Sequence, residues 1–187
     1  MQDKSTVLPI LDLMNNRGYC DYVYHDCATR EELEFFLDKW KQRSVGQKFP
    51  ILYLAFHGEQ GCIFLTNKQK YTLEDLGKFL HHSCLGKVVY FGSCSTFDID
   101  MRIIKRFLEN TGAIAAIGYR TDVDWIQSAA CDLFVFEALQ GDKLDSRGIE
   151  KIHQSIITNY GNLHKLLDLR VVINDRLHFP RSRKPRT

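Results

Sequence analysis

The sequence predicts an α/β fold, in which a mostly parallel sheet is covered by helices on both faces as a three-layer sandwich. Three short, fully apolar runs, at residues 51–56, 88–91 and 113–118, predict buried strands. Longer amphipathic stretches, typical of helices, separate these runs. Strands that alternate with helices pair in parallel, and the connecting helices cover both faces. The composition, 44% hydrophobic and 26% charged, is that of an ordinary globular protein.

The first elements are predicted from capping residues and β-propensity. Residues 7–15 can form a short helix that ends near Gly18. The aromatic and β-branched run 19–25 predicts a strand. Thr29 and Glu32 have the spacing of a capping box, so the next helix begins directly after Thr29.

A hairpin and a helix are predicted between the first two apolar runs. Residues 62–65 and 69–72 are the strands of the hairpin, and Asn67 lies at its turn. Thr72 with Asp75 caps the helix that follows. The helix then leads the chain back to the start of the second strand.

The remaining elements follow the same alternation. Asp98 or Asp100 starts a helix that ends at Gly112, before the third apolar run. Later segments are predicted as helices over 124–139 and 146–160 and a last strand over 169–173.

The chain is predicted to form one domain, residues 1–175, followed by a basic C-terminal tail, residues 176–187. No internal repeat, low-complexity block or Gly/Ser/Pro-rich linker divides it. Five of the cations follow Asp175, so the net charge of +2 becomes −3 for residues 1–175. A basic tail can bind nucleic acid weakly, but we expect a solvated chain end.

Export and membrane insertion are not predicted. No run approaches the ~18 apolar residues of a membrane span, and the first residues lack the order of a secretory signal. The cysteines form no C-x-x-C pair and have no zinc-finger spacing. We therefore expect reduced, mostly buried thiols in a cytosolic protein, with no metal and no cofactor. The cysteines are Cys20, Cys27, Cys62, Cys84, Cys94 and Cys131.

Two reactive side chains follow two of the buried strands. The first strand leads into His57-Gly58, and the second leads into a Gly-Ser-Cys-Ser sequence that contains Cys94. Carboxyl ends of parallel strands meet at one edge of a sheet, where the sites of α/β proteins lie. Neighbouring strands are ~4.8 Å apart, so His57 and Cys94 are predicted to lie close together.

A Cys–His pair suits nucleophilic catalysis. The thiolate is the nucleophile, and an imidazole can accept the thiol proton. Gly58 has no side chain, so its backbone N–H can approach a reacting carbonyl oxygen. Each residue alone is more often structural, and their joint placement is what favours catalysis. A metal site would need His25, Asp26 or Asp98 as further ligands and is disfavoured.

The motifs around these residues resemble those of the caspase–gingipain–separase group of cysteine peptidases. Residues 51–139 are most similar to the CHAT branch, the bacterial relatives of separase. The segments VVYFGSCST and AIGYRTDVDWIQSAACDLFVFEAL match the family's VVLSACxT block and its LWxVxD loop with the following helix. Three family positions differ, because Ser93 replaces Ala, Arg120 replaces the aromatic residue and Asp122 replaces Val. The resemblance implies a caspase-like sandwich, although the Q-A-C-x-G motif of true caspases is absent.

The resemblance also implies roles for individual residues. Cys94 would attack the scissile carbonyl, His57 would serve as acid and base, and the backbone N–H groups of Gly58 and Cys94 would hold the oxyanion. Asp124 aligns with the Asp of LWxVxD, which lies in the specificity pocket of separase-like enzymes and would select Arg or Lys. Asp122 is a competing candidate for this role, and a helix cap is the alternative for Asp124.

We therefore expect a cysteine endopeptidase that cleaves a protein or peptide substrate after a basic residue. The resemblance implies a role in bacterial defence or signalling, with activation by a sensor or partner protein. One alternative is a catalytically silent caspase-like domain that binds or senses. Another, a hydrolase that uses Ser93 or Ser95, is disfavoured because the Gly-x-Ser-x-Gly elbow is missing.

Overall fold

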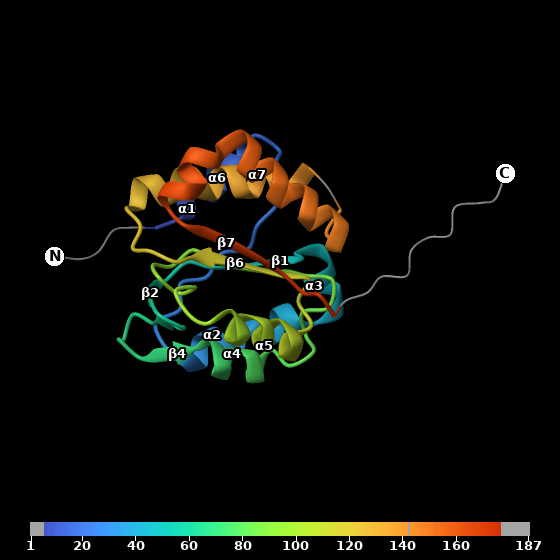
Figure 1. Cartoon of the computed structure of the whole chain (residues 1–187). Helices are drawn as coiled ribbons and strands as arrows, with labels where there is room; N and C mark the ends of the chain where they lie inside the picture. Colours follow the sequence, from blue (N-terminus) through green and yellow to red (C-terminus); the bar gives the residue numbers. More distant parts are fainter. Residues whose placement is uncertain (1–5, 142, 177–187) are drawn as a thin grey trace.

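The central sheet of the computed structural model contains β1, β5, β6 and β7 in that order (Figure 1). The structure describes residues 6–141 and 143–176. The strands are β1 (Ile51–Leu54), β5 (Val88–Phe91), β6 (Ala115–Tyr119) and β7 (Leu169–Ile173). β1, β5 and β6 are parallel, and β7 is antiparallel to β6. The predicted, mostly parallel sheet is therefore confirmed.

Helices cover both faces of this sheet and complete the three predicted layers (Figure 1). The upper layer contains α1 (Leu8–Asn16), α6 (Trp125–Gly141) and α7 (Ser146–Leu166). The lower layer contains α2 (Arg30–Lys41), α4 (Leu73–Phe79) and α5 (Met101–Thr111). The short α3 (Arg43–Lys48) connects α2 to β1.

A second, antiparallel sheet connects β1 to α4. Its strands are β2 (His57–Glu59), β3 (Cys62–Phe64) and β4 (Lys70–Thr72), paired in that order. β3 and β4 are the predicted hairpin, and the structure adds β2, which begins at His57. The strand that carries His57 is therefore tied to the hairpin as well as to the central sheet.

Capping residues fix where the helices of the lower layer begin and end. The Thr29 hydroxyl accepts the N–H of Glu32, and the Glu32 carboxylate accepts the N–H of Thr29, as in the predicted capping box. Thr72 and Asp100 cap α4 and α5 by accepting backbone N–H groups. Gly112 ends α5 with a φ of 74°, a left-handed conformation that glycine adopts without strain.

The central sheet separates two hydrophobic cores. In β5, Val89 and Phe91 belong to the lower core, whereas Val88 and Tyr90 belong to the upper core. This alternation follows from the two-residue period of side chains along a strand. All four side chains are fully buried, as predicted for a strand covered on both faces.

Two predictions about the N-terminal half are wrong. Residues 20–28 have no regular secondary structure, so the strand predicted over 19–25 is not formed. β1 lies at the edge of the sheet, and residues 51–53 are only half-buried instead of fully buried. A strand needs a hydrogen-bonded neighbour, and among the described residues β1 has one only on its β5 side.

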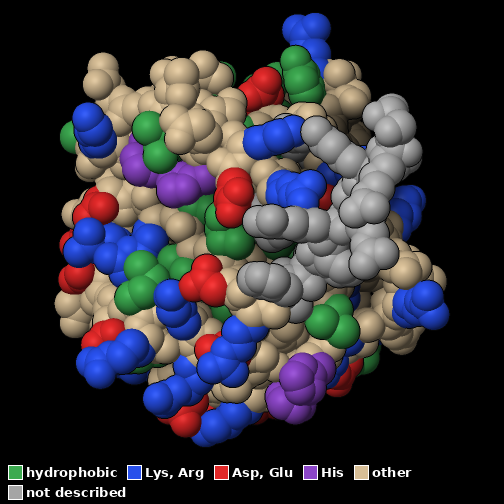
Figure 2. All heavy atoms as spheres, turned by 45° about the vertical axis from the view of Figure 1, so that its right-hand side comes forward, with side chains coloured by type: hydrophobic (Ala, Val, Ile, Leu, Met, Phe, Trp, Pro, Cys, Tyr) green, Lys and Arg blue, Asp and Glu red, His purple; other side chains and the backbone are tan. Residues whose placement is uncertain are grey.

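Charged side chains of both signs are spread over the face shown in Figure 2. Arg176, the first residue of the predicted basic tail, forms an ion pair with Glu109, with 2.9 Å between Nε and Oε1. The rest of that tail, residues 177–187, lies outside the described residues. No helix within residues 6–141 and 143–176 has the length and apolar content needed to cross a membrane.

Candidate active site

His57 and Cys94 follow neighbouring parallel strands of the central sheet. Leu54 of β1 pairs with Phe91 of β5, and each of the two candidate residues lies three positions beyond this pair. His57 is exposed and begins β2, whereas Cys94 is half-buried in the turn after β5. Both residues line one cavity of about 1880 Å³. The structure therefore brings the two predicted catalytic residues to the same site.

Gly58 packs directly against the turn that contains Cys94. A Cβ atom at Gly58 would lie 2.6 Å from the carbonyl oxygen of Cys94 and 2.4 Å from the Thr96 hydroxyl. Neither distance is compatible with a side chain, so the close approach of β2 to this turn requires glycine. This contact holds His57, the preceding residue, next to the turn.

The turn around Cys94 is held by hydrogen bonds on both sides. Ser93 and Thr96 share a hydrogen bond of 2.7 Å between their hydroxyls. Ser95 has a φ of 49°, and its N–H donates to the carbonyl of Thr121. A non-glycine residue in this left-handed region is uncommon.

The Cys94 thiol contacts the backbone of Val123, in the segment between β6 and α6. The N–H of Val123 donates to Sγ across 3.5 Å, and the thiol donates to the carbonyl of Val123 across 3.8 Å. A neutral thiol can make both contacts, whereas a thiolate can only accept the first. The contact therefore places the Cys94 sulfur against the segment between β6 and α6.

The two predicted substrate-binding acids have partners within the chain. Asp122 accepts a hydrogen bond from the Ser95 hydroxyl at 2.8 Å. Asp124 caps α6 by accepting the N–H groups of Ile126 and Gln127, so the structure shows the capping role that was the alternative. Both carboxylates are exposed, and neither lines the cavity. Their role in substrate binding stays a prediction.

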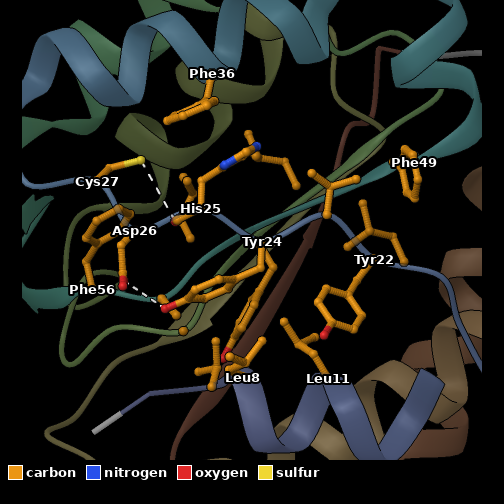
Figure 3. A pocket seen from close by; sticks show the side chains of 18 of the residues that line it. Leu8, Leu11, Tyr22, Tyr24, His25, Asp26, Cys27, Phe36, Phe49 and Phe56 are labelled. Carbon is orange, nitrogen blue, oxygen red and sulfur yellow. Dashed lines mark hydrogen bonds between the residues drawn. The ribbon is translucent and has the colours of Figure 1, made fainter. Parts of the chain in front are cut away.

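The chain segment between α1 and α2 forms the outer wall of the cavity (Figure 3). Tyr22 and Tyr24 lie above the side chains of α1, and His25 stacks on Phe36 of α2 with 3.6 Å between ring centroids. The hydroxyl of Tyr24 donates to Asp26 at 2.7 Å. From their place at the end of a predicted strand, His25 and Asp26 are expected on the surface, with a position in the groove as the alternative. The structure shows both residues exposed and lining the cavity.

The opposite wall of the cavity includes the free edge of β1. The carbonyls of Pro50 and Leu54 accept from β5, so the backbone groups of Ile51 and Tyr53 point away from β5. No described backbone group of residues 20–27 bonds to β1. Unpaired backbone groups at a strand edge can bind an extended peptide.

A buried polar cluster that the sequence does not predict lies between the central sheet and α6. Tyr53, Tyr90 and Tyr119, one from each parallel strand, all donate to the carboxylate of Asp132 in α6. Burial raises the pKa of the Asp132 carboxyl, and the three hydrogen bonds oppose this shift. Tyrosines at three strands facing one helix are the only sequence signal for the cluster, and apolar packing explains such residues equally well.

The other cysteines and the possible metal ligands offer no second site. Burial raises the pKa of Cys84 to about 12 and that of Cys131 to about 11, so neither thiol is activated. Asp98 accepts a hydrogen bond from Gln60 at 2.7 Å. Among residues 6–141 and 143–176, no three His, Cys, Asp or Glu side chains are placed to hold a metal ion.

Comparison with known proteins assigns the chain to a family without assigning an activity. No curated protein matches the sequence. The model of a family described as "Family of unknown function (DUF6642)" matches residues 1–172, and the chain therefore belongs to that family.

Proposed function

We propose that this protein is a cysteine endopeptidase in which Cys94 is the nucleophile and His57 is the general acid and base. The observation that carries the proposal is that His57 and Cys94 follow paired, parallel strands and line the same cavity. The resemblance of residues 51–139 to CHAT peptidases supports it. Because the cavity also presents a free strand edge, it is suited to an extended polypeptide.

The proposed reaction follows from the atoms at the site. His57 accepts the Cys94 thiol proton as the sulfur attacks the carbonyl carbon, and the carbonyl oxygen becomes an oxyanion held by the N–H groups of Gly58 and Cys94. His57 gives this proton to the leaving amine as the C–N bond breaks, which leaves a thioester on Cys94. His57 then accepts a proton from the water that attacks the thioester and returns it to the departing sulfur, which regenerates the thiol.

The contact between Cys94 and Val123 supports a need for activation. The thiol proton must leave the carbonyl of Val123 before the sulfur can attack a substrate. An activating or sensor protein that directs this proton to His57, with the Val123 N–H still on the sulfur, would supply this step. The same contact favours the second candidate function, a catalytically silent domain that binds or senses.

The proposed substrate preference is Arg or Lys before the cleaved bond. Asp122 and Asp124 flank Val123, which lines the cavity, and both carboxylates are exposed. A carboxylate at this position would favour a basic side chain. We place the enzyme in the cytosol of a bacterial defence or signalling system, and the free cysteines are compatible with a reducing compartment.

A peptide library tests the proposal directly. Wild-type protein is expected to cleave after Arg or Lys, and Cys94→Ala is expected to be inactive. Cys20→Ala is the matched control, because Cys20 is also half-buried and lines the same cavity. Cleavage that survives in Cys94→Ala would refute the mechanism.

If the enzyme needs an activator, wild-type protein alone will not cleave the library. A second measurement, covalent labelling, does not depend on turnover. A peptide electrophile that ends in Arg or Lys is expected to label Cys94 and to leave Cys20 unlabelled. If neither cleavage nor selective labelling is found, the silent binding domain is the better description of this protein.

A further inference from the structure

A buried carboxylate lies between the central sheet and the upper helices. Asp132 of α6 is 3% exposed and accepts hydrogen bonds from three phenols. Tyr53 comes from β1, Tyr90 from β5 and Tyr119 from β6, so each parallel strand contributes one donor. The hydroxyls of Tyr90 and Tyr119 are also 3.0 Å apart. One carboxylate therefore ties α6 to every parallel strand.

Burying this cluster costs desolvation free energy that apolar side chains would not. Removing a carboxylate from water is unfavourable, and an apolar cluster of similar volume is often at least as stable. Three phenol donors offset the cost only in one relative placement of the helix and the strands, because hydrogen bonds weaken steeply with distance and angle. The cluster therefore fixes geometry more than it adds stability.

The first connection from the cluster to Cys94 runs through Tyr53. A Cβ atom at Gly92 would lie 2.5 Å from the Tyr53 hydroxyl and 2.6 Å from its Cε2 atom. The tyrosine ring thus packs against the backbone two residues before Cys94. Because Asp132 holds the Tyr53 hydroxyl, it also sets where the turn after β5 begins.

The second connection runs through α6 itself. This helix begins at Trp125, and Val123, two residues earlier, donates its N–H to the Cys94 sulfur. A shift of α6 relative to the sheet would move that donor away from Sγ. The two backbone segments on either side of the sulfur are thus both held by Asp132.

We propose that Asp132 is a positioning residue that holds the Gly92 and Val123 backbones in register around the Cys94 sulfur. The inference rests on the proposed function of Cys94 as a nucleophile. Asp132 acts on Cys94 through Tyr53 and through α6 and does not touch the substrate. Its loss should therefore change the reactivity of the sulfur, which accepts the Val123 N–H, beyond any change in folding stability.

The test is the rate at which iodoacetamide alkylates Cys94, followed by mass spectrometry between about pH 5 and pH 9. In Asp132→Asn, one of the two acceptor oxygens becomes an NH2 donor, so the three phenols cannot keep the same hydrogen bonds, and the rate at neutral pH is expected to fall about tenfold. Tyr53→Phe removes a single donor and keeps the ring, and a fall of about threefold is expected. Thermal unfolding of each variant shows that it is folded at the labelling temperature.

Tyr71→Phe is the matched control. Tyr71 is buried and, like Tyr53, donates to a carboxylate, that of Glu34, but it lies in the lower core. Its loss is expected to lower stability and to leave the alkylation of Cys94 unchanged. The same fall in all three variants would show a general loss of stability and overturn the proposal.

Two further outcomes separate this inference from the proposed function. Unchanged alkylation in folded Asp132→Asn and Tyr53→Phe, or faster alkylation, would overturn the positioning role even if wild-type protein cleaves peptides. Absence of peptide cleavage in wild-type protein, with alkylation still dependent on Asp132, would overturn the peptidase and leave the positioning role intact.

Discussion

The two faces of the central sheet are built from the same strands but stabilised in different ways. The lower core is apolar around β5, where the ring of Phe91 packs against Phe97 and Phe107 at centroid distances of 5.5 and 5.8 Å. The upper core places Asp132 among tyrosines at the same level of the sheet. Apolar burial is tolerant of small shifts, whereas hydrogen bonds to a carboxylate are not.

The difference matters because the site lies where the two faces meet. Cys94 follows β5, and the segment that contacts its sulfur leads into α6 of the upper layer. We therefore expect changes in the lower core to act mainly on stability. Changes in the upper core are expected to act on the sulfur as well.

The largest expected effect is a loss of stability from the lower core. Phe107→Ala removes a buried ring that packs on Phe91, and the free energy of unfolding should fall by about 3–5 kcal/mol because a cavity is left. Urea denaturation measures this change. Alkylation of Cys94 in the folded variant is expected to match wild type, and a marked change would remove the distinction between the two faces.

A matched pair of tyrosines compares the polar contacts of the two faces. Tyr90→Phe removes a donor to buried Asp132 and should cost about 1.5–3 kcal/mol, as expected for a hydrogen bond to a charged group. Tyr71→Phe should cost less, since its acceptor Glu34 keeps an ion pair with Arg30. Equal losses of unfolding free energy in urea denaturation would show that the burial of the acceptor carboxylate does not determine how much a lost hydrogen bond destabilises the protein.

Gly58→Ala tests the contact between β2 and the turn around Cys94. The added methyl group overlaps the Cys94 carbonyl oxygen, so stability should fall by about 1–3 kcal/mol and Cys94 labelling should change. Gly161→Ala in α7 is the control, because nothing lies within 4 Å of the added atom. A stable Gly58→Ala variant with normal labelling would contradict the proposed packing.

Asp124→Ala separates capping from substrate selection. Loss of the cap on α6 should lower the free energy of unfolding by about 1 kcal/mol, measured by thermal unfolding. If Asp124 also binds the basic side chain of the substrate, the rate of cleavage after Arg and Lys should fall far more than the small loss of stability explains. Unchanged specificity would assign Asp124 to capping alone and leave Asp122 as the candidate.

The smallest expected effect is a pH dependence of folding stability that comes from two histidines of the upper layer. Burial lowers the pKa values of His153 and His164 in α7, whose rings are 5.9 Å apart. Near and below pH 6.5 these histidines bind more protons in the unfolded chain than in the folded chain. Their contribution to the free energy of unfolding is therefore present above about pH 6.5 and is lost as the pH falls below it. His153→Gln should weaken this dependence in thermal unfolding, and an unchanged slope would exclude the pair as its source.

Much of the fold follows from local patterns in the sequence. The apolar run Val88–Phe91 is a strand buried on both faces, and the capping box at Thr29 begins α2. These features depend on near neighbours in the chain, so they can be read without tertiary information. The order of His57 and Cys94 after two apolar runs was enough to predict that they lie close together, and the structure places both along one cavity.

Tertiary structure alone decided the features that depend on distant partners. The run 19–25 has the composition of a strand but does not pair with β1, because pairing depends on where α1 and α2 hold its ends. Asp122 and Asp124 are competing candidates for the substrate pocket in the sequence. Only the fold shows that Asp122 accepts a hydrogen bond from Ser95 and that Asp124 caps α6.

The sequence by itself thus determined most of the alternating elements and the placement of His57 and Cys94 after two of them, since both follow from spacing along the chain. Only the tertiary structure showed that Asp132 accepts three tyrosine hydroxyls beneath the site. The physical reason is that burial and hydrogen bonding of a charge are set by groups from several elements. No local pattern around Asp132 distinguishes it from a solvated residue on a helix.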